Sequence, residues 1–149
     1  MRTNILVIVL TLSLIGMACK GKLKPVERKF SNGIIAKYSV DKFNKIQGDY
    51  FEYYPSNKLR MKKKFANGKE EGKVLHFYES GQIREVQFFE DGNLEGVDSI
   101  FGEDGRLTNL ANYKAGLKNG KFIKFKDSTN TPDIESIYES DKLISVKKY

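Results

Sequence analysis

A repeat with a period of 24 residues is the feature of this sequence that most constrains its fold. Glycine, aromatic and aliphatic positions all recur at this spacing. The columns are Gly48, Gly72, Gly96 and Gly120; Gly68, Gly92 and Gly116; Tyr53, Phe77, Phe101 and Phe125; Phe65, Phe89 and Tyr113; and Leu59, Ile83 and Leu107. Such a period is typical of repeat proteins, in which each unit stacks only on its neighbours.

Each unit has the pattern of a β-hairpin. Residues 72–92 hold two apolar and aromatic runs, with Ser80–Gly81 between them and Asp91–Gly92 after them. Glycine, asparagine and aspartate tolerate a positive φ, so they suit chain reversals. The sequence therefore predicts an all-β fold, an elongated antiparallel array of β-hairpin repeats.

The alternation of side chains along a strand predicts the core. Phe51 and Tyr53 are two residues apart and should share a face, as should their equivalents in later units. On the return strands, Leu59 and Phe65 are six residues apart, and an even separation along a strand places both on one face. We expect these stripes to form a continuous core and the opposite face to be mixed.

The repeat and its flanks divide the chain into seven segments. Their expected bounds are 1–18 for a signal peptide, 19–29 for a basic tether, 30–47 for a degenerate opening repeat, 48–71, 72–95 and 96–119 for three regular repeats, and 120–149 for an atypical capping repeat. In the capping repeat Asp127–Asp133 replaces the glycine turn. Terminal repeats commonly depart from the pattern because they present a polar end.

The N-terminal segment has the features of a secretory signal. Arg2 precedes an apolar stretch at residues 5–15, and Gly16 and Ala18 come just before Cys19. As a helix the stretch would span ~17 Å, short of the ~30 Å hydrocarbon core. The small residues before Cys19 resemble a bacterial lipobox, which implies cleavage before this cysteine and its acylation. An ordinary signal peptide with a chance cysteine, or a buried strand, is the alternative.

Positive charge is concentrated beside the expected lipid anchor. Residues 20–47 hold eight basic and two acidic side chains, a net +6, whereas residues 48–149 hold 17 of each. Such a segment suits the anionic head groups of a membrane, and a solvated tether is an equal alternative. A nucleic-acid binder would more often carry this charge on its folded face, so we expect no nucleic-acid partner.

The repeat resembles the variant MORN repeat. The resemblance rests on three stretches. In residues 53–60 and 77–84 two aromatic residues are followed by a turn and then by leucine or isoleucine, and in residues 65–73 an aromatic residue is followed by two glycines four positions apart. It covers residues 48–120 well and the flanks weakly. The family implies a hairpin array used for protein or lipid association. Many bacterial chains with this repeat are named YwqK-family antitoxins, and many are lipoproteins.

The sequence offers no recognisable catalytic constellation. His76 is the only histidine and Cys19 the only cysteine, so a metal site built on these residues is not expected. We interpret His76 as an exposed residue of a repeat strand. The carboxylate pairs, such as Glu70 with Glu71, fall at turns, where solvated charge explains them. We expect no catalytic residues and no cofactor.

One row of side chains is a candidate binding face. It comprises Tyr50, Tyr54, His76, Tyr78 and Phe122, which could offer aromatic and polar contacts to a partner. The alternative is that these residues are cross-strand packing pairs.

These observations favour a non-enzymatic envelope lipoprotein that acts as a protein-binding or scaffold module. The expected location is the bacterial cell envelope, at the outer membrane if the source is Gram-negative, with an unidentified protein partner. An antitoxin that neutralises a toxin by direct contact is the second reading, and an enzyme the third. The sequence leaves the oligomeric state open.

Overall fold

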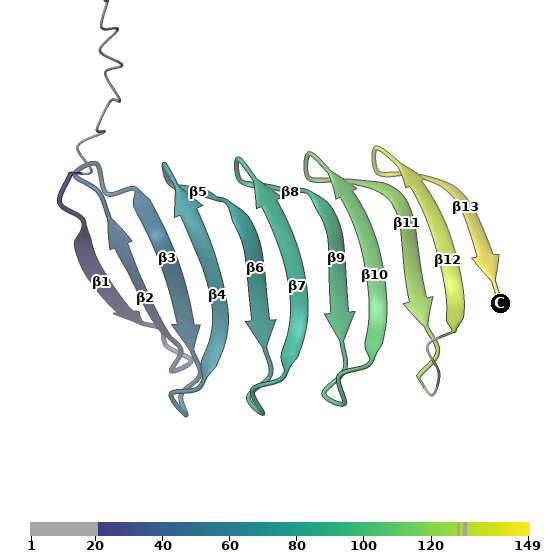
Figure 1. Ribbon diagram of the computed structural model, residues 1–149, viewed down its shortest axis with the longest axis horizontal. Coiled ribbons are helices and arrows are strands. Elements are labelled where there is room, and N and C mark those ends of the chain that lie inside the picture. Colours follow the sequence, from purple (N-terminus) through teal and green to yellow (C-terminus); the bar gives the residue numbers. More distant parts are fainter. Residues whose placement is uncertain (1–20, 128, 130) are drawn as a thin grey trace, which may run out of the picture.

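The computed structural model describes residues 21–127, 129 and 131–149 of the chain. In this part the chain forms one open antiparallel β-sheet with no helix. Figure 1 shows the strands side by side in a single layer, from β1 in purple to β13 in yellow. The predicted array of β-hairpins is confirmed.

Thirteen strands form this sheet. They are β1 (Lys24–Lys29), β2 (Ile35–Val40), β3 (Ile46–Tyr53), β4 (Leu59–Ala66), β5 (Lys69–Glu70), β6 (Gly72–Phe77), β7 (Ile83–Glu90), β8 (Asn93–Leu94), β9 (Gly96–Phe101), β10 (Leu107–Lys114), β11 (Leu117–Phe125), β12 (Pro132–Glu139) and β13 (Lys142–Lys148). Neighbours in the sheet follow chain order, except that β5 pairs only with β4 and β8 only with β7.

The regular units appear as the hairpins β3–β4, β6–β7 and β9–β10. The short strands β5 and β8 fold back on the ends of β4 and β7 before the chain enters the next unit. A further hairpin, β1–β2, precedes the first unit, so residues 24–29, expected in the tether, are a paired strand instead. At the other end, β12 pairs with both β11 and β13.

The turns between units use the residues that the sequence indicated. Asn67 and Gly68 have φ angles of 53° and 82°, and Asp91 and Gly92 have 50° and 84°. Two consecutive positive φ values are the mark of the tight hairpin turn whose twist matches that of the flanking strands. These reversals keep successive units in the same register.

A β-bulge in each return strand overturns part of the predicted face assignment. Met61 lies opposite Glu52, but the next pair is Leu59 opposite Tyr53, so β4 carries one extra residue at this point. The extra residue reverses the alternation, and Leu59 and Phe65 lie on opposite faces. The same shift occurs in the two later units. The prediction that these residues share a face was therefore wrong.

The most buried side chains lie on the face that was not predicted to be the core. Besides Ala36 and Val40 on β2, they are Tyr50, Val74 and Asp98, which belong to a column of 24-residue spacing that continues to the half-buried Phe122. Tyr50 is 9% exposed and Val74 is 2% exposed, whereas Phe51 and its equivalents are half-buried. We call the side of the sheet that carries this column the Tyr50 face.

Truncation of Val74 should weaken the sheet more than truncation of a matched valine on the other face. Val74→Ala removes buried methyl groups and should lower the free energy of unfolding by about 2 kcal/mol. Val97 is 38% exposed, so Val97→Ala should change it by less than about 0.5 kcal/mol. Urea denaturation of both variants measures the difference, and equal losses would contradict the assignment of the core.

Candidate functional site

Tyr50, the first residue of the predicted binding face, is part of the packed column. Its ring stacks on Tyr38 with 5.4 Å between centroids and tilts against Phe65 at 5.7 Å. Its hydroxyl donates a hydrogen bond of 2.9 Å to Glu52 Oε1. The side chain therefore joins three strands, β2, β3 and β4.

Tyr54 and Tyr78 connect successive units. The Tyr54 hydroxyl donates to the carbonyl oxygen of Phe77 at 2.7 Å, and the Tyr78 hydroxyl donates to that of Phe101 at the same distance. Each bond spans 23 residues and reaches into the next hairpin. The third unit has Gly102 at the equivalent position, so this ladder of tyrosines ends there.

His76 is mostly buried, and the expectation of an exposed residue was wrong. Its side chain is 13% exposed, with Nδ1 3.4 Å from Arg84 Nη2 and Nε2 4.0 Å from Glu85 Oε2. Burial lowers the pKa of His76, and the positive charge of Arg84 lowers it further. The imidazole is therefore held toward its neutral form.

Phe122 packs between two tyrosines at the far end of the column. Its ring centroid lies 5.4 Å from that of Tyr113 and 4.8 Å from that of Tyr138, both edge-on. The five predicted residues thus lie spread from β3 to β11, and the structure does not gather them into one site. Cys19, the predicted lipidation site, lies outside the described residues.

Asp98 is the residue that the sequence reasoning missed. It occupies the column of Tyr50, Val74 and Phe122, where every other member is apolar or aromatic. It is only 7% exposed, and its Oδ1 atom has no hydrogen-bond partner in the described chain. A charged residue in a column of large apolar side chains was the available signal.

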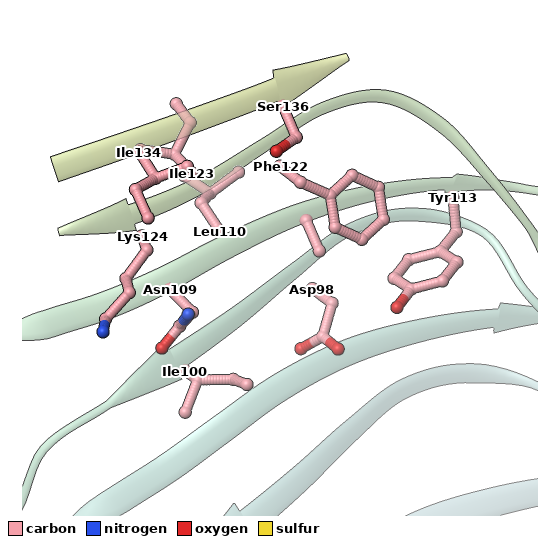
Figure 2. Close-up of a pocket in the computed structure, with 11 residues that line it drawn as sticks. Asp98, Ile100, Asn109, Leu110, Tyr113, Phe122, Ile123, Lys124, Ile134 and Ser136 are labelled. Atoms are coloured by element: carbon pink, nitrogen blue, oxygen red, sulfur yellow. The ribbon is translucent and has the colours of Figure 1, made fainter. Parts of the chain in front are cut away.

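A shallow groove of about 290 Å³ lies beside Asp98 on strands β9 to β12. Its lining includes Asp98, Ile100, Asn109, Ala111, Tyr113 and Phe122, and we call this site the Asp98 groove. Figure 2 shows the hydroxyl of Tyr113 directed toward the Asp98 carboxylate, with Ile100 on the other side. The groove therefore joins a carboxylate to apolar and aromatic walls.

The surroundings of Asp98 supply little compensation for its charge. Gln87 Nε2 donates to Asp98 Oδ2 at 3.2 Å and to Glu85 Oε1 at 3.0 Å, which links the two carboxylates. Burial raises the pKa of Asp98, the Gln87 bond offsets part of this rise, and Glu85 adds to it. No cation of the described chain forms an ion pair with Asp98.

This arrangement is suited to binding by hydrogen bonds and burial. A buried acceptor without a partner is costly, so a ligand that donates a hydrogen bond there gains more than it would at the surface. Burial raises the pKa of Tyr113, and Asp98 raises it further, so the phenol remains a donor. Within residues 21–127, 129 and 131–149, no cluster of three or more His, Cys, Asp or Glu residues could hold a metal ion.

Comparison with known proteins gives no family assignment. No protein-family model matches the chain, and no curated protein matches its sequence. In the part of the chain that the structure describes, no helix has the length and hydropathy needed to cross a bilayer.

Tyr54→Phe tests whether the tyrosine ladder stabilises the sheet. Loss of the hydrogen bond to the Phe77 carbonyl should lower the free energy of unfolding by about 1 kcal/mol. Tyr53 is the matched control, because its hydroxyl has no hydrogen-bond partner among the described residues. Tyr53→Phe should leave the urea midpoint unchanged, and a loss as large as that of Tyr54→Phe would count against the ladder.

Asp98→Asn should make the protein more stable at neutral pH. The folded state disfavours the carboxylate, so its penalty is fully present above the raised pKa and absent below the pKa of unfolded aspartate, about 3.9. The melting temperature of the variant should exceed that of the wild type at pH 7, and the two should converge near pH 3. A less stable variant at pH 7 would show that the carboxylate is compensated in the folded protein.

Proposed function

We propose that this protein is a lipid-anchored envelope protein whose MORN-like β-sheet binds another protein without catalysing a reaction. The observation that carries the proposal is the Asp98 groove, where one oxygen of a buried carboxylate lacks a partner beside aromatic and aliphatic walls. Natural proteins satisfy nearly all buried polar atoms, and exceptions cluster where a ligand completes the site.

The single-layer sheet supports a role in protein association. Both of its faces are open along the described chain, so a partner can lie across several strands. The Asp98 groove combines a hydrogen-bond acceptor with the ring of Tyr113, and tyrosine is enriched at the energetic centres of protein interfaces.

The sequence supports the proposed address. The apolar stretch at residues 5–15, the small residues before Cys19 and the basic segment that follows fit a lipid anchor on an anionic membrane. A partner of such a protein would be sought in the envelope. The resemblance to the variant MORN repeat at residues 48–120 agrees with a binding role.

Site-specific photo-crosslinking in living cells tests the binding function. We expect p-benzoyl-phenylalanine at position 100, in the Asp98 groove, to give a discrete crosslinked protein that mass spectrometry can identify. Ile100 is 36% exposed and lines the groove.

Position 121 is the matched control for this experiment. Lys121 lies on β11 on the opposite face and is exposed. The same probe there should give no adduct of that mass. Equal adducts at the two positions, or none at position 100, would contradict binding through the groove.

Fatty-acid labelling with membrane fractionation tests the address separately. The native chain should incorporate label and sediment with membranes, and Cys19→Ser should lose both properties, because the thiol is the acceptor of the lipid. An unlabelled, uncleaved and cytosolic native chain would reject the envelope location and favour an antitoxin.

A further inference from the structure

The residue directly opposite the column differs among the three regular units. Tyr50 pairs across the strands with Lys63, Val74 with Gln87, and Asp98 with Ala111. These partners also follow the 24-residue period, so they occupy equivalent places on the sheet. The side chain that covers the column in the first unit is therefore replaced by a much smaller one in the third.

In the first unit a lysine covers the column. The Lys63 Nζ atom lies 5.0 Å from the ring centroid of Tyr50 and 5.2 Å from that of Phe65. The same ammonium forms an ion pair with Glu70, and its side chain is 16% exposed. The aliphatic stem of Lys63 therefore lies along the aromatic rings while its charge is compensated.

In the third unit that cover is absent, because Ala111 replaces the lysine and Lys118 takes the place of Glu70. Lys118 Nζ lies 5.6 Å from the ring centroid of Phe122 and forms no ion pair with Asp98. Ala111 has no side chain beyond Cβ, and the Asp98 groove opens beside it. Lys124 lines the same groove, yet it pairs across the strands with Asn109, and Figure 2 shows its amine directed away from Asp98. The space corresponding to that of the Lys63 side chain thus adjoins a buried carboxylate.

We infer that the Asp98 groove binds a primary ammonium group on an aliphatic stem, the chemistry of a lysine side chain, supplied by the partner protein. This inference rests on the proposed binding function and names the group that the site recognises. The stem would lie against Ile100, Tyr113 and Phe122, and the ammonium would donate to Asp98 in the place that Lys63 takes in the first unit.

The geometry favours an ammonium over a guanidinium. Gln87 already occupies Asp98 Oδ2, which leaves Oδ1 as the oxygen without a partner. Arginine binds carboxylates best through both oxygens at once, whereas lysine acts as a compact point charge that needs only one. A site in which only one buried carboxylate oxygen lacks a partner therefore suits lysine.

Titration with n-butylammonium, followed by amide chemical shifts, tests the inference directly. The residues from 21 onward contain every described strand, so this part of the chain, without the signal segment, is the protein to use. We expect saturable shifts confined to residues that line the Asp98 groove. 1-Butanol, a neutral probe of the same length, should give much smaller shifts, and n-butylguanidinium should bind more weakly than the ammonium.

Asp98→Asn and Ala111→Lys give opposite controls. Asp98→Asn should weaken n-butylammonium binding by about tenfold or more, because it removes a charge-assisted hydrogen bond, while the fold becomes more stable. Ala111→Lys should supply the ammonium within the chain, raise the melting temperature and abolish binding of the probe. Ala111→Met should fill the groove without the rise in melting temperature that depends on Asp98.

Several results would overturn the inference. They are equal shifts with the ammonium and the alcohol, no saturable shift with either, shifts that persist in Asp98→Asn, and an Ala111→Lys variant no more stable than Ala111→Met. If crosslinking at position 100 finds no protein while the ammonium binds, the proposed function fails and the recognition chemistry stands. If crosslinks persist unchanged in Asp98→Asn, the function stands and the lysine inference fails.

The mass of the complex in solution distinguishes the two possible sources of the lysine, a second copy of this chain or a different protein. A wild-type dimer in solution that Asp98→Asn dissociates would show that a second copy of this chain supplies the ammonium. A monomer that crosslinks a different protein through position 100, with adducts lost in Asp98→Asn, would assign it to that protein.

Discussion

Contact between residues paired directly across neighbouring strands determines how well this sheet is packed. A sandwich buries each sheet under a second layer, but here one layer must cover itself with its own side chains. Tyr50 is covered because Lys63 lies opposite and Phe65 lies diagonal to it. Since each unit contacts only its neighbours, exchanging one cross-strand partner alters the cover of that unit and leaves distant units as they are.

The repeat period was sufficient to predict the hairpins, and it was insufficient to predict the faces. Turn chemistry is local, so Asn67–Gly68 and Asp91–Gly92 could be recognised from the residues alone. The bulge near Leu59 depends on the register in which β3 and β4 pair. Counting residues along one strand cannot reveal it. Because one extra residue reverses the alternation, Phe65 and Tyr113 lie on the face of Tyr50, and only the rows of Phe51 and Leu59 in the predicted core lie on the other face.

The Asp98 groove was only half visible in the sequence. The column of Tyr50, Val74, Asp98 and Phe122 could be read from the 24-residue period, and its one acidic member was conspicuous among apolar ones. The importance of Ala111 could not be read in the same way, because it depends on knowing that positions 98 and 111 lie opposite each other. Burial of the carboxylate likewise results from three strands meeting around it.

The arrangement of units explains how an uncompensated carboxylate can persist in a thin sheet. In repeat proteins the free energy of unfolding is roughly a sum of contributions from each unit and each interface between units. Well-packed neighbours can therefore compensate for a unit that holds a buried polar atom without a partner. Asp98 is flanked in its column by fully buried Val74 and by Phe122, which packs between Tyr113 and Tyr138. These packed neighbours hold the backbone around Asp98 in place. A polar site in the third unit is therefore preorganised by its neighbours, whereas the same residue at an unpaired edge would be free to move toward water.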